Sequence, residues 1–216
     1  NVSQQSLLLS FNNNGFTVNL NYNGGTNDTV DKLNNTYVGW QWKAGGAGVS
    51  NTAGSITSTV STNLSAGFSV VTFTGTGAAG TVGHGLGVTP SMFIVKSRSA
   101  TGDWWVYHAY ANASPQTGTL WLNLTNGFTS PASYWNNTAP TSSVFSIGTA
   151  GGLNVNGVTQ VAYCFAEVAG YSKFGSYVGN GSTDGPFIYT GFKPRWFMMK
   201  KTSSTSYWII YDTARD

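Results

Sequence analysis

The chain has 216 residues, which is enough for one large domain or two small ones. Only 8% of them are charged and 14% are aromatic, whereas ordinary soluble domains carry about 25% charged residues. So many aromatic residues exclude a disordered chain, and no apolar run approaches the roughly 18 residues of a membrane-spanning helix. The net charge of +3 is small and the basic residues are scattered, so we expect neither a nucleic-acid partner nor membrane insertion.

Short strand-like runs and turn clusters alternate along the chain. Runs rich in aromatic and β-branched residues, such as 40–42, 68–70, 163–165 and 208–211, are typical of strands. Turn-forming clusters such as NNNG, SATGD and GNGSTDG separate them, and no long window keeps a helical apolar stripe free of Gly or β-branched runs. The sequence therefore predicts an all-β fold of antiparallel β-sandwich-like modules with very little helix.

A glycine-rich loop follows the strand-like run 68–74. Residues Gly75 to Gly80 match the G-x-G-x-x-G pattern of dinucleotide-binding loops. Such a loop needs a helix directly after it, because the helix N-terminus holds the pyrophosphate. Residues 81–90 are rich in Gly and β-branched residues and end in a proline, which does not begin a helix. We therefore predict a Gly-rich turn between strands and no bound cofactor.

The chain repeats itself at an offset of 104 residues. Residues 72–107 align without a gap onto 176–211, with 10 of 36 positions identical, among them Phe93 with Phe197. The second copy of the glycine loop displaces the third glycine to position 185, which also argues against a phosphate-binding loop. Repetition on this scale points to related structural modules.

The repeat extends upstream with changes in length. Two further matches lie there: 37–46 resembles 161–170, and 14–18 corresponds to 143–147. We therefore predict two copies of one β-module, residues 1–111 and 112–216, the first with a Ser/Thr-rich insertion near 47–66. The pattern fits two separate sandwiches and also one larger interlocked sandwich, and it does not distinguish them.

Few residues offer catalytic or metal-binding chemistry. The two histidines and the single cysteine, Cys164, lack the spacing of a zinc site, and Cys164 lies in an apolar run that predicts a buried thiol. The one glutamate, Glu167, is the candidate acid of a glycosidase, but its partner carboxylate cannot be named. Asp28 and Asp31 are too few ligands for calcium. We expect a non-enzymatic protein with no metal and no cofactor.

Aromatic residues are more numerous than a core of this size needs. The segment 132–140 places Tyr134 and Trp135 among turn-forming residues and predicts an exposed aromatic loop. Together with Trp104 and Tyr207, these side chains are our candidates for binding a carbohydrate or a protein receptor. The alternative interpretation is packing in the core or between subunits, and we expect a homo-oligomer.

A basic cluster brackets the apolar run 196–199. Lys193 and Arg195 precede this run, and Lys200 and Lys201 follow it. Charged residues at both ends of an apolar run are typical of a strand that is protected against aggregation. We therefore predict a buried strand here.

Four long phrases carry a resemblance to a known family. They are residues 36–61, 83–108, 161–201 and the terminal YDTARD. They resemble a repeat family in virion proteins of tailed bacteriophages, especially marine ones, which are described as tail-fibre or appendage proteins and often stand beside concanavalin A-like lectin domains. The resemblance covers nearly the whole chain and brings no catalytic residues with it.

The resemblance implies an extracellular virion protein of structural and adhesive function. Its expected partners are other virion proteins, further copies of itself and a glycan or receptor on the host surface. A capsid-decorating or purely architectural protein is the first alternative, and a carbohydrate-active enzyme is the second. Because both ends lie within the repeat pattern, we expect the chain to be a segment of a longer fibre protein.

Overall fold

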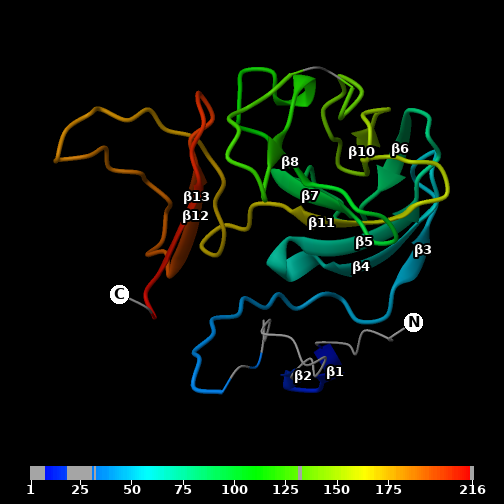
Figure 1. The fold of residues 1–216 in the computed structure, drawn as a ribbon, viewed down its shortest axis with the longest axis horizontal. Coiled ribbons are helices and arrows are strands. Elements are labelled where there is room, and N and C mark those ends of the chain that lie inside the picture. The colour runs from blue at the N-terminus through cyan, green and yellow to red at the C-terminus, as the bar shows by residue number, and fades with distance from the viewer. Residues whose placement is uncertain (1–7, 19–30, 32, 131–132, 215–216) are drawn as a thin grey trace. The chain divides into compact units, whose positions relative to one another are not determined.

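The computed structural model describes residues 8–18, 31, 33–130 and 133–214, in two compact units. The first unit, residues 1–41, contains a hairpin of β1 (Leu8–Asn12) and β2 (Gly15–Val18). The second unit, residues 42–216, contains all the other strands (Figure 1). The fold is all-β and antiparallel, as the sequence predicts. In the described residues, helical structure is confined to two single 3₁₀ turns, Leu64–Ala66 and Pro115–Thr117.

A seven-stranded antiparallel sheet forms the centre of the second unit (Figure 1). Its strands, in spatial order, are β3 (Val49–Asn51), β4 (Ser58–Asn63), β5 (Phe68–Thr74), β11 (Thr159–Phe165), β7 (Met92–Ser97), β8 (Trp104–His108) and β9 (Leu120–Trp121). The Ser/Thr-rich insertion supplies β3 and β4, which form one edge of this sheet. The strand that arrives last along the chain, β11, lies between β5 and β7 and pairs with both.

Side chains alternate between two faces of this sheet, because successive residues of a strand point in opposite directions. The inner face carries Phe93 of β7, Tyr107 of β8 and Cys164 of β11, all of which are buried. A two-stranded sheet of β6 (Gly80–Gly83) and β10 (Val144–Ile147) packs on it through fully buried Phe145 and Ile147. These two layers make the main core.

The outer face of the sheet carries a second, smaller cluster. Met92, Ile94, Val106 and Leu120 are buried there. Partly buried aromatic and aliphatic side chains pack against them: Trp104, Leu122, Phe128, Tyr163, Phe165, Phe174 and Trp208. The outer face is therefore covered by rings that remain partly exposed.

The glycine-rich segment is a turn that joins β5 to β6, in agreement with the sequence prediction. Gly77 has φ = +73°, a left-handed conformation that glycine adopts without strain. Gly75 donates its N–H to Val158 O at 2.9 Å, and a Cβ at this position would collide with the carbonyl of Val155. Gly75 thus allows the close approach of another turn and Gly77 supplies the left-handed conformation, so the turn accounts for both glycines without a bound dinucleotide.

The sequence repeat reappears as a repeated hairpin. Strands β12 (Trp196–Lys200) and β13 (Trp208–Asp212) lie 104 residues after the corresponding positions of β7 and β8. The register is the same: Phe93 pairs with Tyr107 in the first hairpin, and Phe197 pairs with Tyr211 in the second. Their rings lie 4.8 Å and 5.3 Å apart, respectively.

The structural units do not coincide with the two predicted copies. A boundary at residue 111 would separate β8 from β9 and would remove β11 from between β5 and β7. The chain divides after Gln41 instead. The two copies at 1–111 and 112–216 therefore remain a prediction about duplication in the sequence, while the sheet draws strands from both.

Candidate functional site

Trp135 lies in the core, which corrects the predicted exposed position. Its side chain is 0% exposed, and its ring packs edge-on against Phe93, with centroids 4.9 Å apart, and against Tyr107 at 6.2 Å. The residues that follow it, Asn136 and Asn137, both take φ = 51° and form a tight turn that carries the ring inwards. Trp135 therefore cannot contact a receptor while the core is intact.

Tyr134 and Trp104 are half-buried rings fixed by other aromatic side chains. Tyr134 packs edge-on against Trp121 at 5.9 Å, and burial, followed by the nearby charge of Asp103, raises the pKa of its phenol. Trp104 stacks on Tyr163 with the ring centroids 6.4 Å apart, on the outer face of the sheet. Each ring is partly exposed to a ligand, and packing against its neighbouring ring fixes its orientation.

Tyr207 is the one predicted site residue that is largely exposed. It lies between β12 and β13, and its side chain is 75% exposed. Its neighbour Trp208 packs on the outer-face cluster, as Trp104 does, whereas Tyr134 and Trp135 belong to the inner-face cluster. The structure therefore does not gather the four predicted residues into one surface.

The hairpin β12–β13 exposes an apolar face that the sequence prediction missed. Strand β12 was expected to be buried, but Phe197 is 42% exposed, and on β13 Tyr211 is 48% exposed. The residues at the same positions of the first hairpin, Phe93 and Tyr107, are 1% and 3% exposed. The repeat offset held the signal for this face, because it assigns core-type side chains to a hairpin whose Phe197 and Tyr211 belong to neither core cluster of the described residues.

The opposite side of this hairpin is attached to other segments of the second unit. The Trp208 indole N–H donates to Trp121 O at 2.7 Å. The Lys200 ammonium donates to Thr125 O at 3.1 Å and to Ser206 O at 2.9 Å, and burial, more than the charge of Lys201, lowers its pKa. These bonds fix the orientation of the hairpin and leave its Phe197 side facing solvent.

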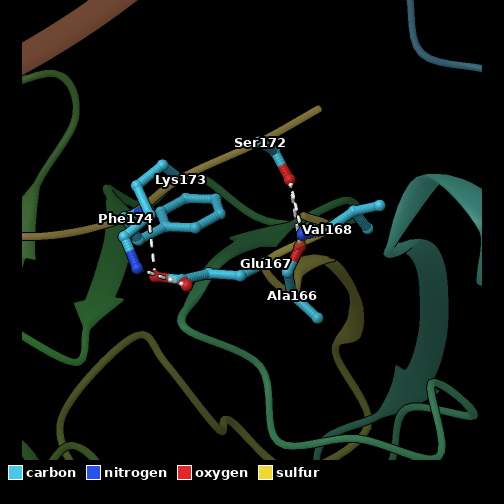
Figure 2. Close-up of polar contacts among 6 residues, drawn as sticks. All are labelled: Ala166, Glu167, Val168, Ser172, Lys173 and Phe174. Atoms are coloured by element: carbon cyan, nitrogen blue, oxygen red, sulfur yellow. Dashed lines mark hydrogen bonds and ion pairs between the residues drawn. The ribbon is translucent and has the colours of Figure 1, made fainter. Parts of the chain in front are cut away.

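Glu167 holds a tight turn directly after β11 (Figure 2). Its Oε2 accepts a hydrogen bond from Lys173 Nζ at 2.8 Å, and its Oε1 accepts one from the Phe174 backbone N–H at 3.2 Å. Within the turn, Val168 and Ser172 pair as an isolated bridge. The hydrogen bond from Lys173 to Glu167 raises the pKa of the lysine. The two carboxylate oxygens thus accept hydrogen bonds from the lysine and from the backbone. Glu167 therefore has a structural function, because these bonds stabilise the turn.

Replacing Glu167 with glutamine tests this structural function. The amide keeps an oxygen that can accept from Phe174 but loses the ion pair with exposed Lys173, so we expect only a small loss of stability, since exposed ion pairs are screened by water. Amide hydrogen exchange around Val168 to Ser172 is expected to accelerate while exchange in β7 stays unchanged. Glu167→Ala, which removes both acceptors, is expected to accelerate exchange further. Equal exchange in all three proteins would contradict the assignment.

The buried thiol and histidines occupy structural positions. Cys164 is fully buried, as predicted, and burial raises its pKa to about 12. His84 is also buried: its Nδ1 accepts from Leu86 N–H at 3.2 Å and its Nε2 lies 3.1 Å from Thr141 O. These two bonds require the neutral ring with the proton on Nε2.

Within the described part of the chain, no three His, Cys, Asp or Glu side chains lie close enough together to hold a metal ion. Of the two aspartates that the sequence analysis judged too few for calcium, Asp28 lies outside the described residues, and Asp31 belongs to no described group of three such side chains. No described helix is long and apolar enough to cross a membrane.

Comparison with known proteins gives one match. A family model described as a domain of unknown function, DUF7483, matches residues 1–216. No curated protein and no solved structure matches the chain. The match covers the chain from end to end.

Proposed function

The chain belongs to the DUF7483 family, and we propose that it is a non-enzymatic structural β-protein of a bacteriophage virion appendage that contributes to attachment at the host surface. Its site of action would be outside the cell, on the virion. Its partners would be other virion proteins, further copies of itself and a glycan or receptor of the host.

The repeated hairpin is the observation that carries this proposal. The same two-stranded unit is built twice in one register, and the second copy turns core-type side chains outwards. Repeated modules that bury their apolar faces against neighbours are the usual construction of extended protein arrays. A virion appendage is such an array, and the sequence resemblance to appendage proteins points to the same class.

Surface chemistry supports the adhesive part of the proposal. The chain carries 8% charged residues, so its polar surface is mostly Asn, Ser, Thr and backbone. Tyr207, Tyr189 and Phe187 are 75%, 79% and 89% exposed, and exposed rings among neutral polar groups suit stacking on sugars. Several weak sites of this kind would act together when an appendage presents many copies.

Attachment to host envelopes tests the role of Tyr207. We expect Tyr207→Ala to reduce binding of the multimeric protein to host envelopes by about tenfold, because one stacking contact is lost at every copy. Tyr171→Ala is the matched control, since Tyr171 is 58% exposed but lies in the Glu167 turn. Unchanged attachment of the Tyr207 variant, or an equal loss in both, would remove Tyr207 from the binding surface.

A capsid-decorating or purely architectural protein is the second candidate, and the exposed apolar face of β12–β13 favours it equally. Imaging the particle at low resolution separates the two, since an appendage protein lies on an appendage and a decorating protein on the capsid.

The carbohydrate-active enzyme has less support, because Lys173 and Phe174 occupy both oxygens of Glu167. Cleavage of host polysaccharide that Glu167→Gln abolishes would revive that candidate.

A further inference from the structure

One side of the β12–β13 hairpin presents apolar side chains to solvent. We call this surface the hairpin face and define it by its four central residues, which are Phe197, Met199, Ile209 and Tyr211. Each residue on β12 pairs with its opposite on β13, and residues two apart in a strand point to the same side. The Tyr177 hydroxyl donates to Met199 Sδ at 3.3 Å, which adds a fifth side chain. Phe197, Ile209 and Tyr211 are 42%, 39% and 48% exposed, so aromatic and aliphatic groups are accessible together.

Basic side chains lie at both ends of the hairpin face. Arg195 directly precedes β12 and extends the ladder by one pair, because its carbonyl accepts a hydrogen bond from Thr213 N–H at 3.0 Å. Lys201 directly follows β12, and its position two residues after Met199 gives it the same side. Both side chains are exposed. Two strand residues six positions apart are separated by about 20 Å, so the hairpin face is a strip of about that length with a cation at each end.

The sequence repeat shows that these charges distinguish the second copy from the first. At the offset of 104 residues, Arg195 corresponds to Ser91 and Lys201 to Ser97, whereas the apolar positions between them remain apolar. The first hairpin is covered by the core, and Ser97 is buried there. A charge in such a dry position costs free energy unless it is paired, while at an exposed position it attracts an anion. The second copy thus combines core-type side chains with a rim that suits a negatively charged ligand.

The charge of the whole chain has the same asymmetry. Residues 1–170 carry four basic and four acidic residues, so the net charge of +3 belongs to residues 171–216, which carry six basic and three acidic ones. Tyr207 contributes to the difference between the copies, since its counterpart in the first copy is Asp103. The hairpin strands contain one carboxylate, Asp212, which lies on the opposite side because it follows Tyr211 by one residue. The charges at the ends of the hairpin face are therefore both positive.

We infer that the hairpin face binds an acidic polysaccharide, a chain of sugars that carry carboxylate or sulfate groups. The rings of Phe197 and Tyr211 stack on the apolar faces of the sugars, while Arg195 and Lys201 pair with the anionic groups. The spacing favours an extended chain over a single sugar, because two cations about 20 Å apart do not both reach one small ligand. The inference rests on the adhesive part of the proposed function and names the class of glycan that it recognises.

Two other occupants fit the hairpin face less well. A second copy packed on it face to face would bring cations of the two copies together, and like charges in close contact are destabilising. Single-stranded nucleic acid also combines ring stacking with anionic groups, but proteins bind it in grooves that are positive along the backbone. The hairpin face has its cations only at the two ends, with apolar side chains between them.

Binding to matched polymers tests the inference. Dextran sulfate and polygalacturonate supply sulfates and carboxylates, and dextran is the neutral counterpart of the first. We expect titration calorimetry at low salt to detect binding of both acidic polymers and no binding of dextran. Arg195→Ser combined with Lys201→Ser, which installs the residues of the first copy, is expected to weaken this binding by about tenfold and to reduce its dependence on salt. Lys43→Ser combined with Arg98→Ser is the matched control, since it removes the same charge from exposed residues outside the hairpin.

A further variant separates stacking from charge. Tyr211→Ser keeps both cations and is expected to weaken binding of the acidic polymers by about fivefold, with an unchanged circular dichroism spectrum, since the ring is exposed in the single chain. Four results would each overturn the inference: no binding of either acidic polymer, equal losses in the two charge variants, no loss in Tyr211→Ser, or tighter binding of oligothymidylate than of the acidic polymers. A dimer in sedimentation experiments that Tyr211→Ser abolishes would also overturn it, in favour of a second copy as the occupant.

Attachment to host envelopes distinguishes failure of the inference from failure of the proposed function. If the acidic polymers do not bind while Tyr207→Ala still lowers attachment, the inference fails and the adhesive function stands. If the polymers bind as expected while Arg195→Ser with Lys201→Ser attaches to envelopes as the parent protein does, the hairpin face binds acidic polysaccharide and the attachment function fails.

Discussion

Replacing Trp135 with alanine is expected to lower the free energy of unfolding by about 3–5 kcal/mol. The side chain is fully buried at the centre of the inner-face core, where it contacts Phe93 and Tyr107 edge-on. Its removal loses the transfer free energy of a large ring and leaves a cavity that these two rings can fill in part only. Chemical denaturation followed by circular dichroism measures the change.

Trp135→Phe is the matched control for this prediction. The Trp135 indole N–H has no hydrogen-bond partner among the described residues, so its removal relieves a buried unpaired donor while the smaller ring still fills most of the space. We expect a loss below about 1.5 kcal/mol, and this variant also remains measurable if the alanine variant does not fold. An alanine variant within 1 kcal/mol of the parent protein would contradict the core position of Trp135.

Trp135 also shows where inference from local sequence fails. Turn-forming residues on both sides predicted a loop correctly, but a turn does not fix the direction of the ring that it carries. Asn136 and Asn137 direct the ring inwards, towards Phe93, which lies more than forty residues away in sequence. Local sequence contains no information on that contact. By contrast, Cys164 in its apolar run and the glycine turn at Gly75 were predictable, since strand alternation and turn chemistry are local properties.

The repeat was the most informative feature of the sequence. The segments that it aligns without a gap form hairpins β7–β8 and β12–β13, which have the same register. It did not reveal that β11 would be inserted between β5 and β7, because strand order is set by tertiary packing. Topology was thus the information that the sequence lacked.

Acidification is expected to destabilise the protein through two histidines that the fold holds in the neutral form, fully buried His84 and partly buried His108. His108, at the end of β8, accepts a hydrogen bond from Tyr110 N–H through Nδ1 at 3.2 Å and lies 6.0 Å from the Phe174 ring. Burial lowers its pKa from 6.5 to about 4. Burial also lowers the pKa of His84, and the Thr141 carbonyl opposes this more weakly. In both residues, a proton on Nδ1 would break a backbone hydrogen bond.

The direction of the effect follows from proton binding. Below pH 6.5 the unfolded chain protonates His108 and the folded chain does not, so the stability that is fully present above pH 6.5 falls as the pH decreases towards 4. At about 1.4 kcal/mol for each pKa unit, the shift of His108 from 6.5 to about 4 corresponds to about 3.5 kcal/mol in total, of which about 2 kcal/mol is lost between pH 7 and pH 5. Denaturation midpoints across this range measure the loss before most carboxylates titrate.

His108→Gln provides the control, because its amide oxygen can accept from Tyr110 N–H but does not titrate. The slope of stability against pH is expected to flatten by about 2 kcal/mol between pH 7 and pH 5 relative to the parent protein. His84→Gln is expected to flatten the slope in the same direction. Parallel slopes for the parent protein and His108→Gln would mean that His108 titrates normally in the folded chain, and hence that water reaches the ring at the end of β8.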